Sequence, residues 1–308
     1  MTATPLTRPP RLRPGDRVAV VSPAGPVPEE MLERGCARLA EWGLEAVPGP
    51  HALDVRADLR YLAGTDAARA ADLEAAWLDP DIAGVLCARG GYGAQRMIDL
   101  LDWAAMRAAP AKVLVGYSDI TALHEAFATR LGVVTVHGPM VGTGSFVEGG
   151  DSTDRLRALL MEPETQLVLT SPSAEALVPG TATGVTMGGC LSLLAAELGS
   201  PCARPGAAGG IVLLEDLEED LYRLDRMLTQ LLRAGWFDGV AGVALGSWVD
   251  CGDGVRELVL DRLGPLGVPI AWELGFGHCT PALSVPLGVT ATLDADAGTL
   301  TLAAPALA

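Results

Sequence analysis

The sequence has few of the features that mark disulfide-linked, zinc-binding or membrane proteins. Its six cysteines are scattered and form no C-x-x-C pair, so neither a disulfide framework nor a zinc site is indicated. No apolar stretch is long and uninterrupted enough to span a bilayer. The first ten residues contain three prolines and lack the apolar core of a signal peptide. We therefore expect a cytoplasmic protein.

Positive charge is also scarce. Lys112 is the only lysine, and 22 basic residues face 38 acidic ones, which gives a net charge of −16. This balance argues against nucleic acid and anionic membranes as partners. Because 49% of the residues are hydrophobic and 19% are charged, the chain is expected to be compact. A length of 308 residues suits two domains.

The first half of the chain alternates between short apolar runs and segments with helical spacing. Apolar runs at 17–21, 82–87 and 113–115 are each followed by a helical pattern. This alternation predicts an α/β domain with a parallel, doubly wound sheet over residues 1–150. A linker region is expected at 151–180, and a smaller, strand-rich domain at 181–308.

Ser118 stands between one of these strands and the following helix. It follows the apolar run 113–115, and an apolar helical segment begins at Ile120. A serine at such a turn resembles the nucleophile elbow of hydrolases, where backbone N–H groups stabilise negative charge. Ile120 replaces the second glycine of the G-x-S-x-G pattern. The alternative is that Ser118 only caps the helix.

A nucleophilic serine requires a base, which is most often histidine, and a group that orients the base. Among four histidines, two remain as candidates: His278, in the Gly- and Pro-containing loop 275–281, and His137, at the end of a strand. Glu215 directly follows an apolar strand that would hold its carboxylate in place. It is therefore the preferred orienting acid.

The segment 89–93, Arg-Gly-Gly-Tyr-Gly, allows backbone N–H groups to approach a ligand closely. It could form an oxyanion hole or a phosphate cradle. No Lys-Ser/Thr pair follows it, and the chain lacks the dinucleotide fingerprint at this point. A nucleotide-dependent oxidoreductase is therefore disfavoured.

Taken together, these segments resemble the LD-carboxypeptidase family (serine peptidase family S66), which includes murein tetrapeptide carboxypeptidases and microcin C immunity peptidases. The resemblance runs through most of the chain and rests on the order of its motifs, which lie at residues 13–16, 89–93, 116–121, 137–140, 214–216, 222–228, 277–281 and 286–288. One departure is Cys190, where the family commonly has asparagine.

The resemblance implies a catalytic triad of Ser118, Glu215 and His278. It also implies a flavodoxin-like N-terminal domain, a strand-rich, β-barrel-like C-terminal domain, a homodimer, and no metal or other cofactor. We expect backbone N–H groups near Gly91 and Asp119 to form the oxyanion hole.

The expected substrate is a small peptide, a murein tetrapeptide whose terminal D-alanine is released during peptidoglycan recycling. Arg89 and Tyr92 are expected to contact it, with Arg89 pairing with its terminal carboxylate; alternatively, Arg89 only holds its loop. Two other functions remain open: an immunity peptidase that cleaves aminoacyl-nucleotide analogues, and a non-catalytic ligand-binding protein. The role of Cys279, beside His278, is also open.

Overall fold

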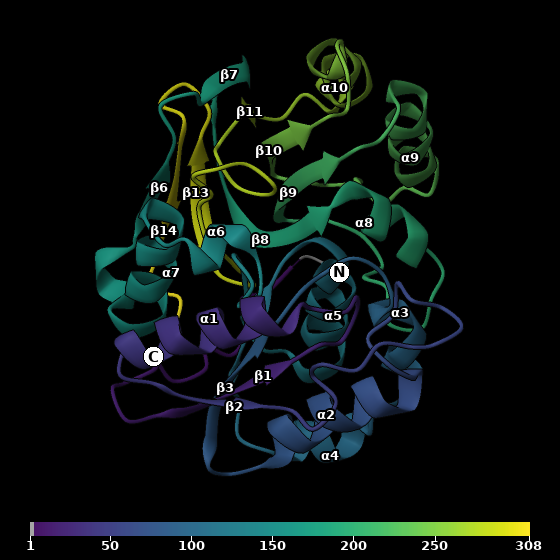
Figure 1. Ribbon diagram of the computed structural model, residues 1–308. Coiled ribbons are helices and arrows are strands. Elements are labelled where there is room, and N and C mark those ends of the chain that lie inside the picture. The colour runs from purple at the N-terminus through teal and green to yellow at the C-terminus, as the bar shows by residue number, and fades with distance from the viewer. Residues whose placement is uncertain (1–2) are drawn as a thin grey trace.

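The computed structural model describes residues 3–308 and contains two β-sheets, one above the other in Figure 1. The first sheet has six strands, in the spatial order β12 (Val285–Leu287), β5 (Thr135–His137), β4 (Val113–Gly116), β3 (Ile82–Cys87), β1 (Arg17–Val21) and β2 (Glu45–Pro48). Five of the six are parallel, as the alternating pattern predicted. The carboxyl end of β4 therefore opens toward the segment that carries Ser118.

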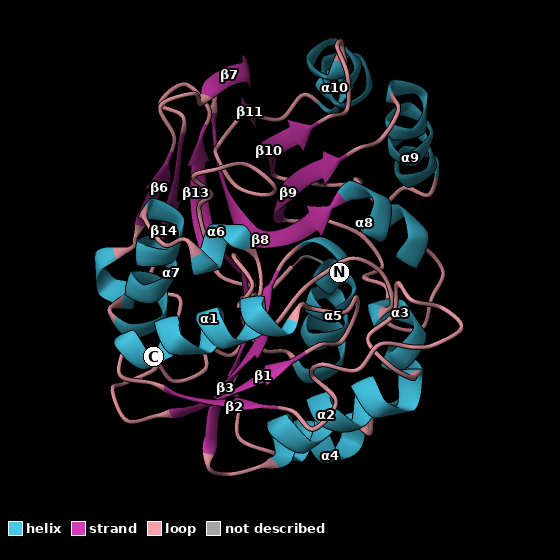
Figure 2. Cartoon of the chain, viewed as in Figure 1, coloured by secondary structure: helices cyan, strands magenta, loops and turns pink. Residues whose placement is uncertain are grey.

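Both faces of the first sheet are covered by helices (Figures 1 and 2). Val18 and Val20 pack into the core on the side of α1, whereas Ala19 and Val21 pack against α2 on the opposite side. This alternation is what a strand buried on both faces requires. The helices of this half are α1 (Glu29–Glu41), α2 (Asp66–Leu78), α3 (Ala94–Met97), α4 (Trp103–Ala108), α5 (Thr121–Ala126), α6 (Gly144–Val147) and α7 (Asp151–Met161).

The second sheet has eight strands, in the order β6 (Val168–Thr170), β14 (Thr299–Leu302), β13 (Thr290–Asp294), β8 (Thr181–Cys190), β9 (Gly210–Leu217), β10 (Gly242–Val249), β11 (Ile270–Trp272) and β7 (Glu175–Val178). Its two edge strands, β6 and β7, are separated by only four residues. Such a short connection brings the edges together, so the sheet is strongly curled, consistent with a barrel-like arrangement.

The second sheet also packs against helices, namely α8 (Leu191–Glu197), α9 (Leu221–Arg233) and α10 (Val255–Leu263). In α9, Leu224, Leu228 and Leu231 recur at helical spacing and form a fully buried stripe, whereas Leu221, at the start of the same pattern, is 37% exposed. The other side of the sheet shares a core with the first sheet, because Ile211 and Leu213 belong to the same buried cluster as Val18. The two halves are therefore packed together through a common core.

Two segments differ from the expected division of the chain. The apolar run 285–293 was predicted to belong to the second half, but it divides between the two sheets. Its first part, β12, pairs antiparallel with β5 of the first sheet, with Val285 opposite His137. Its second part enters β13. The segment 151–180, predicted as a linker region, contains α7, β6 and β7.

Candidate active site

Ser118 has an unusual backbone conformation. It is one of only four non-glycine residues with positive φ in the described chain, at 62°. The left-handed region is unfavourable for a residue with a side chain, and such strain is concentrated at functional sites. Ser118 follows β4 and opens a short 3₁₀ turn that leads into α5. This is the strand–turn–helix context that the sequence predicted.

The departure from the elbow pattern at Ile120 has a steric explanation. A Cβ atom on Gly116 would lie 2.9 Å from two carbons of the Ile120 side chain. The isoleucine therefore fills the space that the glycine leaves open. The glycine two residues before Ser118 is required here, whereas the position two residues after it accepts a large, fully buried side chain.

The glycine-rich segment 89–93 lies directly against Ser118. A Cβ on Gly90 would approach Ser118 Cβ to 3.0 Å and Ser118 Oγ to 3.2 Å. The Gly90 carbonyl in turn accepts a hydrogen bond from the Gly25 N–H at 2.9 Å. Gly91 follows with φ of 103°. Sequence reasoning singled out Gly91 but missed Gly90, whose lack of a side chain permits the contact.

Arg89 and Tyr92 border a cavity of about 490 Å³ next to this loop. Arg89 Nη1 donates a hydrogen bond to the Pro26 carbonyl at 2.8 Å, so the arginine also holds the loop. The Tyr92 ring is 46% exposed and lies 5.8 Å from the ring of Tyr61. Arg60 completes the polar lining, so two guanidinium groups border one cavity.

Asp119 is buried, and its carboxylate ties the serine turn to the glycine-rich loop. Its Oδ2 accepts a hydrogen bond from the Ala94 N–H at 2.8 Å, at the start of α3. Burial raises the pKa of Asp119 to about 6, although the bond from Ala94 and the charge of Arg69 act in the opposite direction. The Asp119 carboxylate thus has a structural role, because it holds the start of α3. The backbone N–H of Asp119 is the group that is expected to face an oxyanion.

His278 and Glu215 lie 63 residues apart in sequence and meet in the structure. His278 Nδ1 is 2.6 Å from Glu215 Oε2, and the Glu215 carboxylate is fully buried. Gly277 makes this contact possible, because a Cβ there would lie 2.6 Å from the same oxygen. Glu215 lies inside β9, not at its end as the sequence suggested.

Tyr117 connects this pair to the serine turn. Its ring centroid lies 4.8 Å from that of His278, and Tyr117 immediately precedes Ser118. Burial, together with nearby Glu215, raises the pKa of Tyr117 to about 12, so the ring stays neutral. The described residues show no hydrogen bond between Ser118 and His278. Nothing in the sequence beyond its place next to Ser118 singled out Tyr117.

His137, the other candidate base, lies on the far side of the same carboxylate. Its Nε2 is 3.7 Å from Glu215 Oε1, and neither atom has a hydrogen-bond partner in the described chain. Burial by itself raises the pKa of Glu215, but the imidazoles of His137 and His278 outweigh it and lower the pKa to about 2. Glu215 is therefore ionised throughout the physiological pH range.

Within residues 3–308, neither of the remaining two histidines pairs with Glu215, although the ring of His124 lies 6.3 Å from that of His137. His124 Nε2 is 2.9 Å from the Gly116 carbonyl, and burial with nearby His137 lowers the pKa of His124 to about 3. A neutral ring that donates to Gly116 fits this environment and helps to fix the end of β4. His51 is half exposed and contacts Asp54 in an early turn.

Cys190 joins the two halves near the site. Its backbone N–H donates to Thr121 Oγ1 at 3.0 Å, which connects β8 to the helix after Ser118. Its Sγ lies 3.4 Å from Asp216 Oδ1, and the residue is only 2% exposed. The cysteine therefore acts mainly through packing and its backbone.

Two further observations concern residues 3–308. No helix in this range combines the length and the apolar character that crossing a membrane demands. Within the same range, no group of three or more histidine, cysteine, aspartate or glutamate side chains is arranged as a metal site.

Comparison with known proteins identifies the class. Two family models match the chain, the LD-carboxypeptidase N-terminal domain over residues 18–138 and the LD-carboxypeptidase C-terminal domain over residues 183–293. A Streptomyces coelicolor protein that carries a carboxypeptidase name is 62% identical over 98% of both chains. The murein tetrapeptide carboxypeptidase of Pseudomonas aeruginosa is 33% identical, covering 91% of this chain and 94% of its own.

Solved structures agree with this class. The muramoyltetrapeptide carboxypeptidase from Oxalobacter formigenes superimposes with a TM-score of 0.77 and 27% identity, covering 93% of this chain and 97% of its own. The microcin C7 self-immunity protein of Escherichia coli is a more distant relative, 26% identical over 92% of this chain and 91% of its own. The fold and these relatives define the protein as a carboxypeptidase. The chain belongs to the LD-carboxypeptidase family, peptidase family S66.

Proposed function

We propose that this protein is a serine carboxypeptidase that hydrolyses the L,D-peptide bond before a terminal D-alanine in murein tetrapeptides, with Ser118, Glu215 and His278 as its triad. The observation that carries the proposal is the 2.6 Å contact between His278 and the fully buried Glu215. The ring of Tyr117 packs against His278, and Tyr117 directly precedes the strained Ser118, so the pair lies beside the serine turn. The named activities of the Pseudomonas and Oxalobacter relatives support the substrate class.

In the proposed reaction, Ser118 Oγ attacks the carbonyl carbon of the diamino acid while His278 Nε2 takes the serine proton. The tetrahedral intermediate then collapses, the C–N bond breaks, and His278 returns the proton to the departing amine of D-alanine. Water, deprotonated by His278, hydrolyses the acyl-enzyme and restores Ser118. Glu215 accepts from His278 Nδ1–H throughout and stabilises the imidazolium.

The oxyanion is proposed to be stabilised by backbone N–H groups near Gly91 and Asp119. Donors of this kind typically contribute about 3 kcal/mol each. The contact between Gly90 and Ser118 supports this assignment, because it brings the loop backbone next to the nucleophile. Arg89, with Tyr92 beside it, is proposed to receive the terminal carboxylate in the cavity that Arg60 also lines.

The test is to incubate the purified protein with L-Ala-γ-D-Glu-meso-diaminopimelate-D-Ala and to measure free D-alanine. Wild type should release it, and Ser118→Ala should reduce kcat by at least about a thousandfold. Ser200→Ala, in the turn after α8, is the matched control and should retain activity. Absence of release by wild type, or undiminished release by Ser118→Ala, would refute the proposal.

The immunity-type activity is the weaker alternative. Within residues 140–180, the only aromatic side chain is Phe146, which is fully buried against Trp42 with ring centroids 5.4 Å apart. It is therefore not exposed for stacking on a nucleobase. Cleavage of an aminoacyl sulfamoyl adenosine in preference to the tetrapeptide would favour this alternative. A protein that binds the tetrapeptide without cleaving it would be a non-catalytic binder.

We further propose that the protein acts as a cytoplasmic homodimer in peptidoglycan recycling, as the family resemblance implies. Light scattering after gel filtration should then give about twice the chain mass of 31.8 kDa. Cells that lack the protein should accumulate the tetrapeptide in their cytoplasmic extract. A monomeric mass, or an unchanged tetrapeptide level, would contradict the corresponding part of the proposal.

A further inference from the structure

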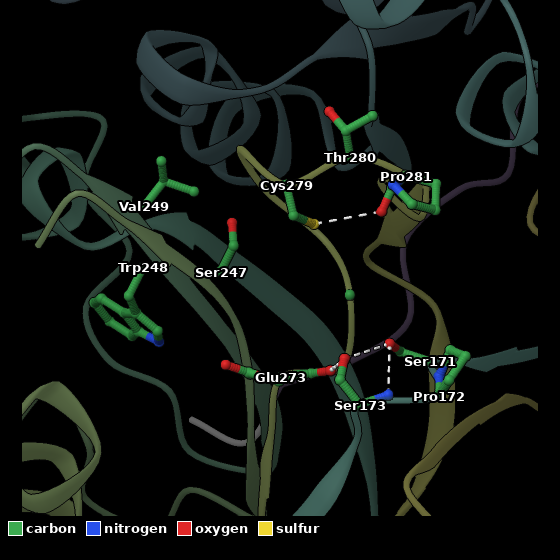
Figure 3. A pocket seen from close by; sticks show the side chains of 11 residues that line it. Ser171, Pro172, Ser173, Ser247, Trp248, Val249, Glu273, Cys279, Thr280 and Pro281 are labelled. Atoms are coloured by element: carbon green, nitrogen blue, oxygen red, sulfur yellow. Dashed lines mark hydrogen bonds between the residues drawn. The ribbon is translucent and has the colours of Figure 1, made fainter.

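A second cavity, of about 520 Å³, lies on the histidine side of the site (Figure 3). Its walls come from the turn between β6 and β7, the end of β10, and the loop after β11. Trp248, Pro172 and Pro281 supply apolar surface, and serines supply hydroxyl groups. Pockets that combine apolar walls with a few polar groups are the usual form of small-molecule sites.

Glu273 is the only charged side chain that lines this cavity. Its carboxylate has no ion-pair partner within residues 3–308, and its side chain extends toward the side where Trp248 lies (Figure 3). The backbone of Glu273 has φ of 52°, one of the four positive values outside glycine, as at Ser118. Strain of this kind at a cavity wall suggests a constraint imposed by function.

The loop that carries Glu273 also carries His278. Cys279, next to His278 in sequence, lines the cavity. Burial raises the pKa of the Cys279 thiol, and the charges of Glu215 and Glu273 raise it further. Glu273 is thus within electrostatic reach of the histidine loop. The Ser247 N–H donates to the Phe276 carbonyl at 2.9 Å, which fixes this wall against β10.

The two cavities have opposite charge. The one beside the Ser118 loop is lined by Arg60 and Arg89, whereas the one beside the His278 loop is lined by Glu273. A substrate that occupies both would be expected to have a carboxylate at one end and a cation at the other. A peptide that ends in D-alanine and has a diamino acid before it carries both groups.

We infer that the Glu273 cavity is the subsite for the side-chain ammonium of the diamino acid that precedes the terminal D-alanine. This inference rests on the proposed function and deepens it. The ammonium lies against Glu273, and the methylene groups of the side chain pack on Trp248 and Pro172. The subsite would therefore select lysine- or diaminopimelate-type stems over stems with an uncharged side chain.

Binding and turnover of two matched peptides test the inference: L-Ala-γ-D-Glu-L-Lys-D-Ala and the same peptide with L-norleucine in place of lysine. Norleucine keeps the four carbons of the side chain and removes the ammonium. Titration calorimetry with Ser118→Ala measures binding without hydrolysis. We expect the lysine peptide to bind about three- to tenfold more tightly, because ion pairs at partly exposed sites are modest. Adding Glu273→Gln should remove the difference.

Charge reversal sharpens the test. Glu273→Lys, in the Ser118→Ala background, should favour a peptide with L-2-aminoadipate at the third position over the lysine peptide. Glu257→Gln, an exposed carboxylate on α10, is the matched control and should leave the lysine preference intact. This control separates a local contact from the general attraction of cations to a chain of net charge −16.

The binding results test the Glu273 subsite, and a separate measurement of D-alanine release tests the proposed function. Equal binding of the two peptides, no binding of either, or a preference that survives Glu273→Gln would overturn the subsite. So would displacement of the bound lysine peptide by adenosine monophosphate that is lost when Trp248→Ala is added, since the cavity would then hold a nucleobase. D-Alanine release by wild type, measured in parallel with both peptides, decides the proposed function whatever the binding result.

Discussion

The serine turn and the histidine loop are held in place in different ways. The backbone of Ser118 is set by its place between β4 and α5, and Gly90, from the loop after β3, packs against it. His278 lies in a loop that leaves the second sheet at β11 and enters the first sheet at β12. The same loop is held to α7, because the Ala282 N–H donates to Ser152 Oγ at 2.8 Å.

The difference explains how one site is built from two sheets. A nucleophile on a local turn keeps its geometry as long as that turn is folded. The base depends on contacts between distant segments, above all the buried carboxylate of Glu215. Because β12 completes the first sheet, the histidine loop is anchored on both sides of the site. We therefore expect substitutions near His278 to act by disturbing contacts between distant segments. Substitutions near Ser118 should act mainly on the serine turn itself.

The largest effect should come from removing the charge of Glu215. Glu215→Gln is nearly isosteric but cannot stabilise an imidazolium, and it allows the histidine to take the wrong tautomer. We expect kcat for D-alanine release to fall by about 10⁴-fold, as for the equivalent change in serine proteases. Circular dichroism and the melting temperature serve as controls for folding. Retention of more than a tenth of the activity would remove Glu215 from the proposed triad.

The histidine loop can be displaced without touching its functional groups. Gly277→Ala adds a Cβ that would lie 2.6 Å from Glu215 Oε2, at φ of 95°. We expect kcat to fall by about a hundredfold, because misplacement by 1 Å costs this much. Gly267→Ala is the matched control, with φ of 68° and nothing within 4 Å of its Cβ. Both variants carry backbone strain, so equal losses of activity would show that the contact with Glu215 is unimportant.

His137 should act as a positioning residue through Glu215. Removing it with His137→Phe takes away one of the two imidazoles that lower the carboxyl pKa. That pKa should therefore rise, and a 13C NMR titration of the Glu215 carboxyl measures the change directly. The amide of His137→Gln can still donate toward Glu215 Oε1, so this variant should change the Glu215 pKa less. His124→Phe, which removes a ring bound to Gly116 instead, is the control. A Glu215 pKa unchanged in His137→Phe would leave His137 with a packing role alone.

The smallest expected effect comes from Asp119, next to Ser118, and concerns the free energy of unfolding. Asp119 has a pKa of about 6 in the folded protein against an ordinary value of 3.8, so the fold retains a proton that the unfolded chain releases. Stability should therefore fall as pH rises from about 4 to about 6, by up to about 3 kcal/mol. Asp119→Asn keeps the acceptor for the Ala94 N–H and should abolish this contribution.

Urea unfolding at pH 4 and pH 8 measures the change for wild type and Asp119→Asn. The exposed Asp253→Asn is the control and should preserve the wild-type dependence. The same pH dependence in wild type and Asp119→Asn would contradict the assignment.

Much of the first half could be predicted from the sequence. The buried strands β1, β3 and β4 and the helices after them follow from apolar runs and helical spacing, and Ser118 was found from its place between such a run and a helix. The place of β12 could not be predicted. Its residues read as one apolar run with β13, and a local pattern does not specify the sheet to which a strand is added.

The sequence by itself determined the parallel sheet, the serine turn and, through the order of its motifs, the family. Only the tertiary structure decided that His278 meets Glu215, that His137 faces the other oxygen of the same carboxylate, and that Gly90 touches Ser118. The physical reason is the range of the interactions. Strands, helices and turns depend on residues a few positions apart, whereas a buried carboxylate between two imidazoles depends on how segments far apart in sequence pack.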